Sequence, residues 1–174
     1  MKIVRLTTFL DFGGIETRLS TIAHVKDDNE WIFCAINKGG SAESKIRNQN
    51  KRVYVFNLPY KIPSIITIYR LRVFFKKEKP DVVHTSGAEA NFHGVLAARL
   101  AHIPVIIAEE VGIPSQNKIT KVIFGLVYRF SDYVVGNSDK VIDYLKNKNN
   151  VSFKKLVKIY NPLLFPSLDN PTKK

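Results

Sequence analysis

The feature that most constrains the fold is the alternation of short apolar runs with longer amphipathic segments along the chain. Several short runs are nearly continuous in valine and isoleucine, which is typical of strands buried on both faces of a sheet. Strands are predicted over residues 2–6, 31–36, 52–57, 81–84, 105–108, 133–135 and 156–159. Helices are predicted over residues 15–25, 42–49, 64–79, 89–101, 115–130 and 139–148. Because such alternation builds right-handed βαβ units, we expect an α/β Rossmann-like sandwich with a mostly parallel sheet and helices on both faces.

Composition excludes several classes of protein. The 174 residues, 45% of them hydrophobic, suit one domain or half of a two-domain protein. Cys34 is the single cysteine, so neither a disulfide framework nor a cysteine-based metal site is expected. The histidines show no metal-ligand spacing, and no cofactor is predicted. Since neither a leader peptide nor an apolar run of ~20 residues occurs, we expect a cytoplasmic protein, soluble or peripheral to a membrane.

The net charge of +12 indicates an affinity for polyanions but does not identify one. The segments 63–80 and 117–130 combine basic residues with aromatic and aliphatic ones, and such helices can rest on an anionic lipid surface. Core packing and an ordinary solvated surface explain the same residues. No motif of a nucleic-acid-binding fold is present, so no nucleic-acid partner is predicted.

Polar residues and glycines are concentrated where the predicted strands end. Ligands of an open parallel sheet bind beyond the carboxyl ends of its strands, so these residues predict a cleft. They are Gly13, Gly14, Glu16, His84, Ser86, Gly87, Glu89, Glu109, Glu110, Asn137, Ser138 and Asn161.

The pair Gly13-Gly14 between the first strand and the first helix has two interpretations. The glycines can bring backbone N–H groups and the positive helix end to a phosphate. Alternatively, Gly13 only caps the helix and Glu16 complements the helix dipole. A dinucleotide-binding loop is excluded, because the G-x-G-x-x-G spacing and the acidic residue after the second strand are both missing.

The remaining edge residues also leave alternatives open. Ser86 and Glu89 have the spacing of a capping box, with Ser86 at the N-cap. His84 is either a buried, hydrogen-bonded histidine or a cleft residue. Glu109 and Glu110 are adjacent on a strand and point to opposite sides of the sheet, so one of them is expected to face the cleft. They cannot form a glycosidase pair, because side chains on opposite faces cannot flank one bond.

Four segments occur in the order and spacing of the N-terminal half of retaining GT-B glycosyltransferases of the family 4 type. They are GGIETRLSTIA, DVVHTSGAEANFHGVLAARLAHIPVIIAEEVGIP, SDYVVGNSDKVIDYL and VKIYNPL. The chain most resembles members that assemble bacterial capsular and other surface polysaccharides. The resemblance implies a metal-independent enzyme that moves a sugar from a nucleotide-sugar to a saccharide or polyprenyl-diphosphate-linked acceptor, at the inner face of the plasma membrane.

The resemblance also implies roles for individual residues. Gly13, Gly14 and Glu16 resemble the loop that approaches the donor diphosphate. The acceptor side and the cleft edge would be formed by His84, Ser86, Gly87, Glu89, Glu109, Asn137, Ser138 and Asn161. Glu110 is the candidate catalytic residue, because a carboxylate at the cleft can assist proton movement. The chain departs from the family here, since many members have a histidine at this position. Pro162 stands where many members have a glycine.

The resemblance covers residues 1–165 and leaves 166–174 as a tail or the start of a linker. The donor-side motif E-x₇-E and its paired Arg or Lys have no counterpart in the chain. We therefore expect an acceptor-side domain whose donor-binding partner domain is absent. The alternative is a non-catalytic Rossmann-like binding module, or a membrane-recruiting subunit of a split transferase.

The first prediction is that the 174-residue chain by itself transfers no sugar, because most contacts to the nucleotide are expected from the missing domain. Incubation with UDP- and GDP-sugars and a lipid-linked acceptor should give no product above the buffer control. Robust transfer would place the donor site in this half.

Overall fold

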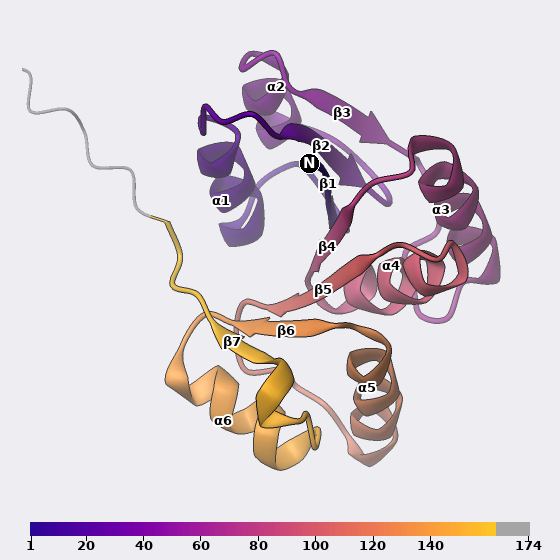
Figure 1. Cartoon of the computed structure of the whole chain (residues 1–174), viewed down its shortest axis with the longest axis vertical. Helices are drawn as coiled ribbons and strands as arrows, with labels where there is room; N and C mark the ends of the chain where they lie inside the picture. The colour runs from indigo at the N-terminus through magenta and orange to yellow at the C-terminus, as the bar shows by residue number, and fades with distance from the viewer. Residues whose placement is uncertain (163–174) are drawn as a thin grey trace, which may run out of the picture.

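The computed structural model describes residues 1–162 and confirms the α/β expectation (Figure 1). Seven strands form one sheet in the order β3-β2-β1-β4-β5-β6-β7, and every neighbouring pair is parallel. The strands are β1 (Lys2–Thr7), β2 (Glu30–Ala35), β3 (Arg52–Val55), β4 (Val82–Ser86), β5 (Val105–Glu110), β6 (Tyr133–Gly136) and β7 (Leu156–Lys158). The predicted tail at 166–174 lies outside the described residues.

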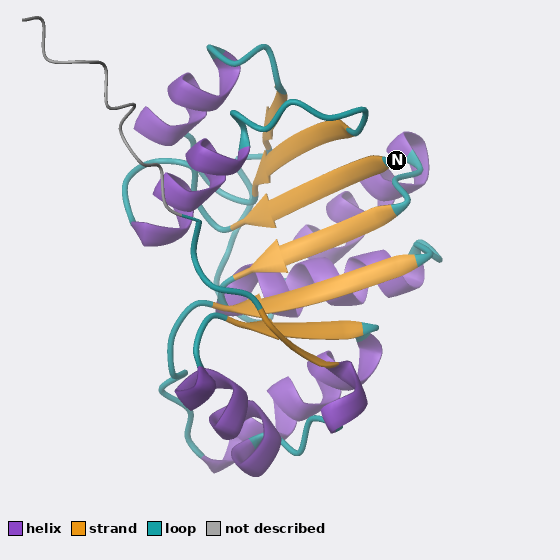
Figure 2. Ribbon diagram, turned by 60° about the vertical axis from the view of Figure 1, so that its left-hand side comes forward, coloured by secondary structure: helices purple, strands orange, loops and turns teal. Residues whose placement is uncertain are grey.

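Helices cover both faces of the sheet, as Figure 2 shows. They are α1 (Gly14–Ile22), α2 (Ser41–Arg47), α3 (Ile65–Glu78), α4 (Ala88–Leu100), α5 (Lys118–Phe130) and α6 (Asp139–Lys148), with the 3₁₀ turn η1 (Phe153–Lys155) before β7. Helices α1 and α2 cover one face at β1–β3 and share a small apolar cluster around Leu19, Phe33 and Ile46. The side chains of α3–α6 join the larger cluster on the other face. The sheet reverses its winding beside β1, which is where ligands of such folds bind.

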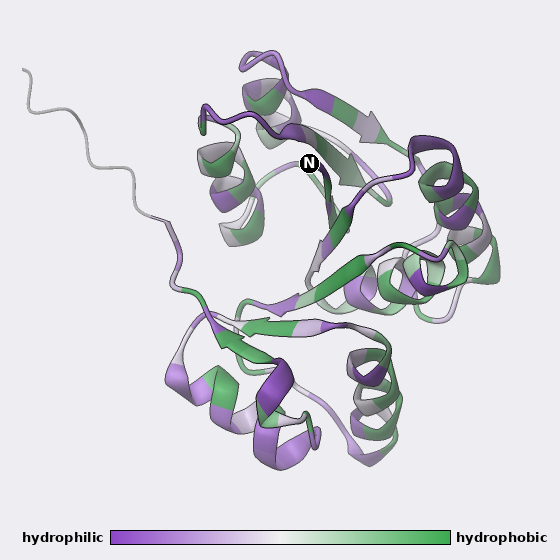
Figure 3. Cartoon of the chain, in the orientation of Figure 1, coloured by the Kyte–Doolittle hydropathy of each residue, from purple (hydrophilic) through white to green (hydrophobic). Residues whose placement is uncertain are grey.

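The side chains of β1 alternate between these two environments. Val4 and Leu6 are fully buried in the larger cluster. Figure 3 shows green, hydrophobic stretches along the strands of the sheet. Arg5 and Thr7 point to the face of α1, because successive strand residues face opposite sides. Arg5 is a buried charged residue in the middle of a central strand, and it belongs to the candidate site described below.

Four strands are longer than predicted (β1, β4, β5 and β6), and the extra residues of β4 and β5 matter for the site. Strand β4 continues to Ser86 and β5 to Glu110, because the ladder between them continues and pairs Ser86 with Glu109. The polar residues expected in loops are therefore fixed on neighbouring strands, where side chains directly opposite each other are in contact distance.

The capping box predicted at Ser86 is wrong. Helix α4 has Gly87 at its N-cap, with φ of +90°, and receives no side-chain cap. The Ser86 hydroxyl donates instead to Glu109 Oε2 at 2.7 Å, because Ser86 still belongs to the strand. The predicted helix start at residue 115 also moves, since Asn117 caps α5 by accepting from Thr120 N. None of the described helices is long and apolar enough to cross a membrane.

Helix α4 lies so close to the sheet at Gly94 that no side chain fits. A Cβ at this position would lie 2.6 Å from the Leu6 and Thr85 side chains. We expect Gly94→Val to lower the free energy of unfolding by about 1–3 kcal/mol through overpacking, which corresponds to a loss of roughly 3–10 °C in Tm. Gly112→Val is the matched control, because a Cβ at Gly112 meets nothing within 4 Å. Equal melting temperatures for the two variants in thermal denaturation would contradict this account of the packing.

Candidate functional site

A cavity of about 430 Å³ lies between the β1–α1 loop, the first turns of α1 and the segment that follows β7. Its lining residues are Phe12, Gly13, Gly14, Thr17, Arg18, Thr21, Asn161 and Pro162. The cavity is at the carboxyl edge of the sheet, where the sequence predicted a cleft. It brings together the Gly-Gly pair and Asn161, which are far apart in the sequence.

The two glycines play different parts in this loop. Gly13 is the N-cap of α1 with φ of +155°, and a Cβ there would collide with the Glu16 carboxylate, which folds back over it. Gly14 has open space around it, so a side chain at this position would project without meeting the fold. The first N–H groups of α1 have no side-chain cap, which leaves the positive end of the helix free to meet an anion.

Buried charges lie directly beneath the cavity. Arg18 of α1 binds Glu109 of β5 with two hydrogen bonds, 2.6 Å to Oε1 and 2.7 Å to Oε2. Arg5 of β1 reaches the same carboxylate at 3.1 Å. All three side chains are at most 6% exposed. Two guanidinium groups therefore share one carboxylate, and the cluster carries an excess positive charge.

The pKa values of this cluster keep that charge fixed near neutral pH. Burial lowers the pKa of Arg5 to about 10, and Glu109 offsets part of the loss, so Arg5 stays protonated. Burial alone would raise the pKa of Glu109. The hydrogen bond of His84 and the charges of both arginines outweigh it and hold that pKa well below its usual range.

His84 is the buried, hydrogen-bonded histidine of the two alternatives. Its Nδ1 lies 2.5 Å from Arg5 Nη1. Because a guanidinium can only donate, His84 Nδ1 accepts and the ring proton sits on Nε2, which faces Glu109 Oε2 at 3.2 Å. Burial, followed by the charge of Arg5, lowers the pKa of His84 to about 4, so the ring is neutral at pH 7.

Two guanidinium nitrogen atoms of the cluster have no partner among the described residues. They are Arg5 Nε and Arg18 Nε, both buried. Arg18 also donates from Nη1 to Asn161 Oδ1 at 3.3 Å, which ties the segment after β7 to the cavity. An arginine with an unused donor, 6% exposed and lining a cavity beside a helix N-terminus, favours an anionic ligand there.

Glu110, the predicted catalytic residue, lies on the opposite face of the sheet. Its carboxylate accepts hydrogen bonds from Asn91 of α4 and Tyr128 of α5, both at 2.8 Å. Burial raises the pKa of Glu110 to about 7, and the hydrogen bonds of Tyr128 and Asn91 offset part of this rise. The catalytic role of Glu110 stays a prediction. The sheet separates its carboxylate from the cavity, which argues against that role.

The other predicted edge residues surround the cluster in supporting positions. Glu89 accepts from the Thr8 hydroxyl of the β1–α1 loop at 3.3 Å. Asn137 donates to the Val111 carbonyl oxygen at 2.8 Å and joins two loops of the edge. Ser138 caps α6 by accepting from Val141 N. Neither Asn137 nor Ser138 lines the cavity.

Arg5 and Arg18 are the functional residues that the sequence did not reveal. Arg5 lies between apolar residues of strand β1, whose sequence is KIVRLT. A charged residue inside a central strand is the signal that could have revealed it. Arg18 follows Gly14 by four residues, which places it one helical turn beyond the loop and on the same side. Neither signal predicts that Arg18 binds the carboxylate of Glu109, which is 91 residues away in the sequence.

The model of the family described as Glycosyltransferase Family 4 matches residues 12–163. The chain belongs to glycosyltransferase family 4. The match spans the Gly-Gly loop, Arg18, Glu109 and Asn161, whereas Arg5 precedes it. No curated protein matches the sequence.

Solved structures show how this family 4 chain relates to larger proteins. Anabaena HepE in complex with UDP and glucose has a TM-score of 0.76 and 19% identity, over 94% of this chain and 45% of that chain. The lipopolysaccharide outer core galactosyltransferase WaaB gives 0.71 and 17%, over 98% and 50%. The UDP-GlcNAc 2-epimerase of Neisseria meningitidis, bound to UDP-GlcNAc, gives 0.66 and 15%, over 91% and 45%. These likenesses confirm the fold, and the chain spans about half the length of each.

The raised pKa of Glu110 predicts a measurable pH dependence. The folded state holds this proton more tightly than the unfolded chain, whose carboxyl group has the ordinary pKa of 4.5. The resulting stabilisation is complete below pH 4.5 and is lost as the pH rises through about 7. We expect Glu110→Gln to equal the wild type in stability near pH 4 and to exceed it at pH 8 by roughly 2–3 kcal/mol.

Urea denaturation of both proteins across this pH range measures the difference. The opposing titration of His84 is common to both and cancels. A constant difference between the two proteins at all pH values would show that folding does not raise the pKa of Glu110.

Proposed function

We propose that this chain is the acceptor-side half of a retaining, hexosyl-transferring enzyme. It would move a sugar from a nucleotide-sugar to a saccharide acceptor. The observation that carries the proposal is the cavity at Gly13-Gly14, whose wall includes the buried Arg18 with its unused Nε. Membership of glycosyltransferase family 4 and the titles of the related structures, which name UDP and UDP-sugars, support a nucleotide-sugar as the ligand.

The chemistry of the cavity suits a leaving diphosphate. Negative charge builds up on the diphosphate as the sugar departs, and fixed positive charge beside it lowers the barrier. Arg18, the excess charge of the cluster and the free N-terminus of α1 supply that field without a metal ion. We therefore propose a metal-independent transfer, in which the buried cluster holds Arg18 in place.

The acceptor is the second part of the proposal. We propose a lipid-linked saccharide used in bacterial surface polysaccharide synthesis, handled at the cytoplasmic side of the membrane. The support is the sequence resemblance together with the likeness in fold to WaaB, a lipopolysaccharide outer core galactosyltransferase. Glu89, His84 and Asn137 lie at the sheet edge on which such an acceptor would approach.

A non-catalytic binding module, or a membrane-recruiting subunit of a split transferase, is the competing function. It would keep the fold and the anion cavity without a donor-binding partner domain. The reading frame after Lys174 separates the two. A second βαβ domain with the E-x₇-E motif supports the transferase, and a stop codon supports the module.

Gly14→Val tests the cavity directly. In the full-length enzyme that the proposal implies, the new side chain would occupy the space of the diphosphate, and we expect at least about a tenfold loss of kcat/KM. The melting temperature should not fall, because a Cβ at Gly14 meets nothing within 4 Å. Gly112→Val, equally free of neighbours, is the matched control and should keep full activity.

Transfer assays with thermal melts of the three proteins decide the result. Full activity of Gly14→Val would return the glycine pair to a purely structural role. A loss of activity together with a loss of stability would also count against the proposal, since it would show that the fold and not the ligand needs the glycine.

A further inference from the structure

Phe12, in the loop between β1 and α1, is the most exposed large apolar side chain of the described residues, at 92%. A single exposed phenylalanine is common on protein surfaces. Phe12 differs because it belongs to the wall of the cavity, together with Gly13, Arg18 and Asn161. Its ring is therefore available to a ligand that occupies the cavity.

The loop that carries Phe12 is fixed on both sides of this residue. Before it, the Asp11 carbonyl oxygen accepts from Ala42 N at 3.0 Å. After it, the Gly13 carbonyl oxygen accepts from Thr17 N, also at 3.0 Å, in the first turn of α1. The backbone at Phe12 is thus held in place, so a ligand would have to order little beyond the side chain itself.

The rest of the cavity wall offers hydrogen-bonding groups of both kinds. Thr17 and Thr21 donate their hydroxyl protons to carbonyl oxygens one turn earlier, at 2.7 and 3.1 Å, and their oxygen lone pairs remain as acceptors. Asn161 accepts from Arg18 through Oδ1, while its amide N–H groups are donors. Since a sugar hydroxyl both donates and accepts, this wall suits a ring that carries several hydroxyls.

We propose that Phe12 is a specificity-determining residue that stacks on a pyranose ring of the acceptor saccharide, an inference that rests on the proposed transferase function. The hydroxyls of that ring would bind the two threonines and Asn161. A pyranose carries C–H groups on its faces and hydroxyls at its rim. Stacking on an aromatic ring removes an apolar face from water and leaves the rim free for hydrogen bonds. The glycine pair and Arg18 remain for the diphosphate.

Two other parts of the substrates match the wall less well. A prenyl chain requires a continuous apolar groove, whereas Thr17, Thr21 and Asn161 place polar groups beside Phe12 and Pro162. A nucleobase would lie with the nucleoside, whose contacts are expected from the donor-side domain of the proposed enzyme. The sugar ring combines an apolar face with a polar rim, as this wall requires.

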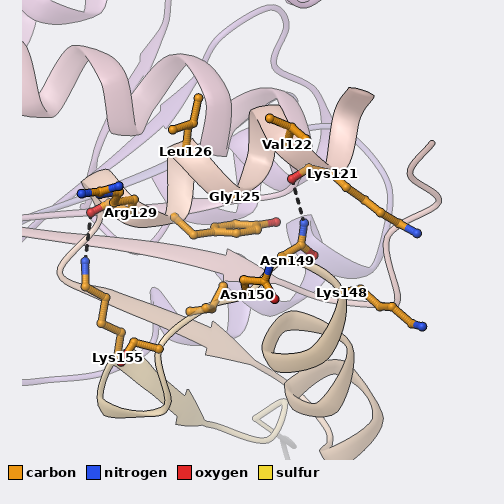
Figure 4. A pocket seen from close by; sticks show the side chains of 12 residues that line it. Lys121, Val122, Gly125, Leu126, Arg129, Lys148, Asn149, Asn150 and Lys155 are labelled. Carbon is orange, nitrogen blue, oxygen red and sulfur yellow. Dashed lines mark hydrogen bonds between the residues drawn. The ribbon is translucent and has the colours of Figure 1, made fainter. Parts of the chain in front are cut away.

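A second hollow, of about 440 Å³ between α5 and the turn after α6, lacks this combination (Figure 4). The aromatic residue in its wall, Tyr128, is 1% exposed and presents no free ring face. Figure 4 shows basic side chains around the hollow, among them Lys155, which donates to the Arg129 carbonyl oxygen at 2.9 Å. An exposed ring face and hydroxyl-binding groups therefore occur together at Phe12 and not in this hollow.

Saturation-transfer NMR of the 174-residue chain tests the contact directly. The probes are the methyl glycosides of glucose, galactose and N-acetylglucosamine. We expect the wild type to transfer saturation to the ring C–H protons of at least one of them. Phe12→Ala should reduce this signal roughly three- to tenfold, and Phe12→Tyr should keep it. The matched control is Phe153→Ala, which removes another exposed ring, 72% exposed at the start of η1, and should keep the signal.

Kinetics of the full-length enzyme assign the contact to one substrate. Phe12→Ala should raise KM for the acceptor roughly three- to tenfold and change KM for the nucleotide-sugar less than about twofold. Thermal melts should give the same Tm for the wild type and the variant, because the side chain is almost fully exposed.

Several results would overturn the inference. They are absence of saturation transfer to all three sugars, equal signals from the wild type and Phe12→Ala, or a lower Tm of the variant that accounts for its loss. A KM change confined to the nucleotide-sugar would assign Phe12 to the donor instead. A change seen only with prenyl-bearing acceptors, and not with a water-soluble saccharide, would assign it to the lipid. Absence of turnover by the wild-type enzyme would refute the proposed function, while the NMR result would still decide whether Phe12 binds a sugar ring.

Discussion

The ion pair between Arg18 and Glu109 is the interaction on which the arrangement of the site depends. It joins the first helix to the fifth strand across 91 positions of sequence, and its two short hydrogen bonds fix the guanidinium plane. Through Glu109 the pair also engages Arg5 of β1 and Ser86 of β4. The wall of the cavity is therefore set by three neighbouring strands and one helix.

Burial explains why this cluster can serve an anion. A buried carboxylate with two guanidinium partners is satisfied, but the second positive charge is left without a counterion among residues 1–162. An anionic ligand in the cavity would supply that missing charge, and the free end of α1 points to the same place. Neutral His84 contributes a hydrogen-bond acceptor to Arg5 and no further charge.

The cavity and helix α5 lie on opposite faces of the sheet. Helix α1 covers the face that holds Arg18 and Glu109, whereas α5 packs on the face that holds Glu110. The buried hydrogen bond from Tyr128 of α5 to Glu110 of β5 ties the helix to that face.

How much the sequence could predict differs between the fold and the site. The periodicity of apolar residues is a local property of the sequence. It predicted the order of strands and helices along the chain and a mostly parallel sheet, and hence the sheet edge at which Gly13 and Gly14 lie. The N-cap of α4 was missed because Ser86 remains in the β4 ladder, which depends on its partner Glu109.

The roles of Arg5, Arg18 and Glu110 were decided only by tertiary structure. Adjacent glutamates look equivalent in sequence, yet one meets two arginines and the other a tyrosine and an asparagine, because they face opposite sides of the sheet. The sequence alone fixes which side each side chain takes relative to its neighbour. The groups that each side chain meets on its side of the sheet depend on how helices distant in the chain pack there. No local sequence pattern encodes these contacts.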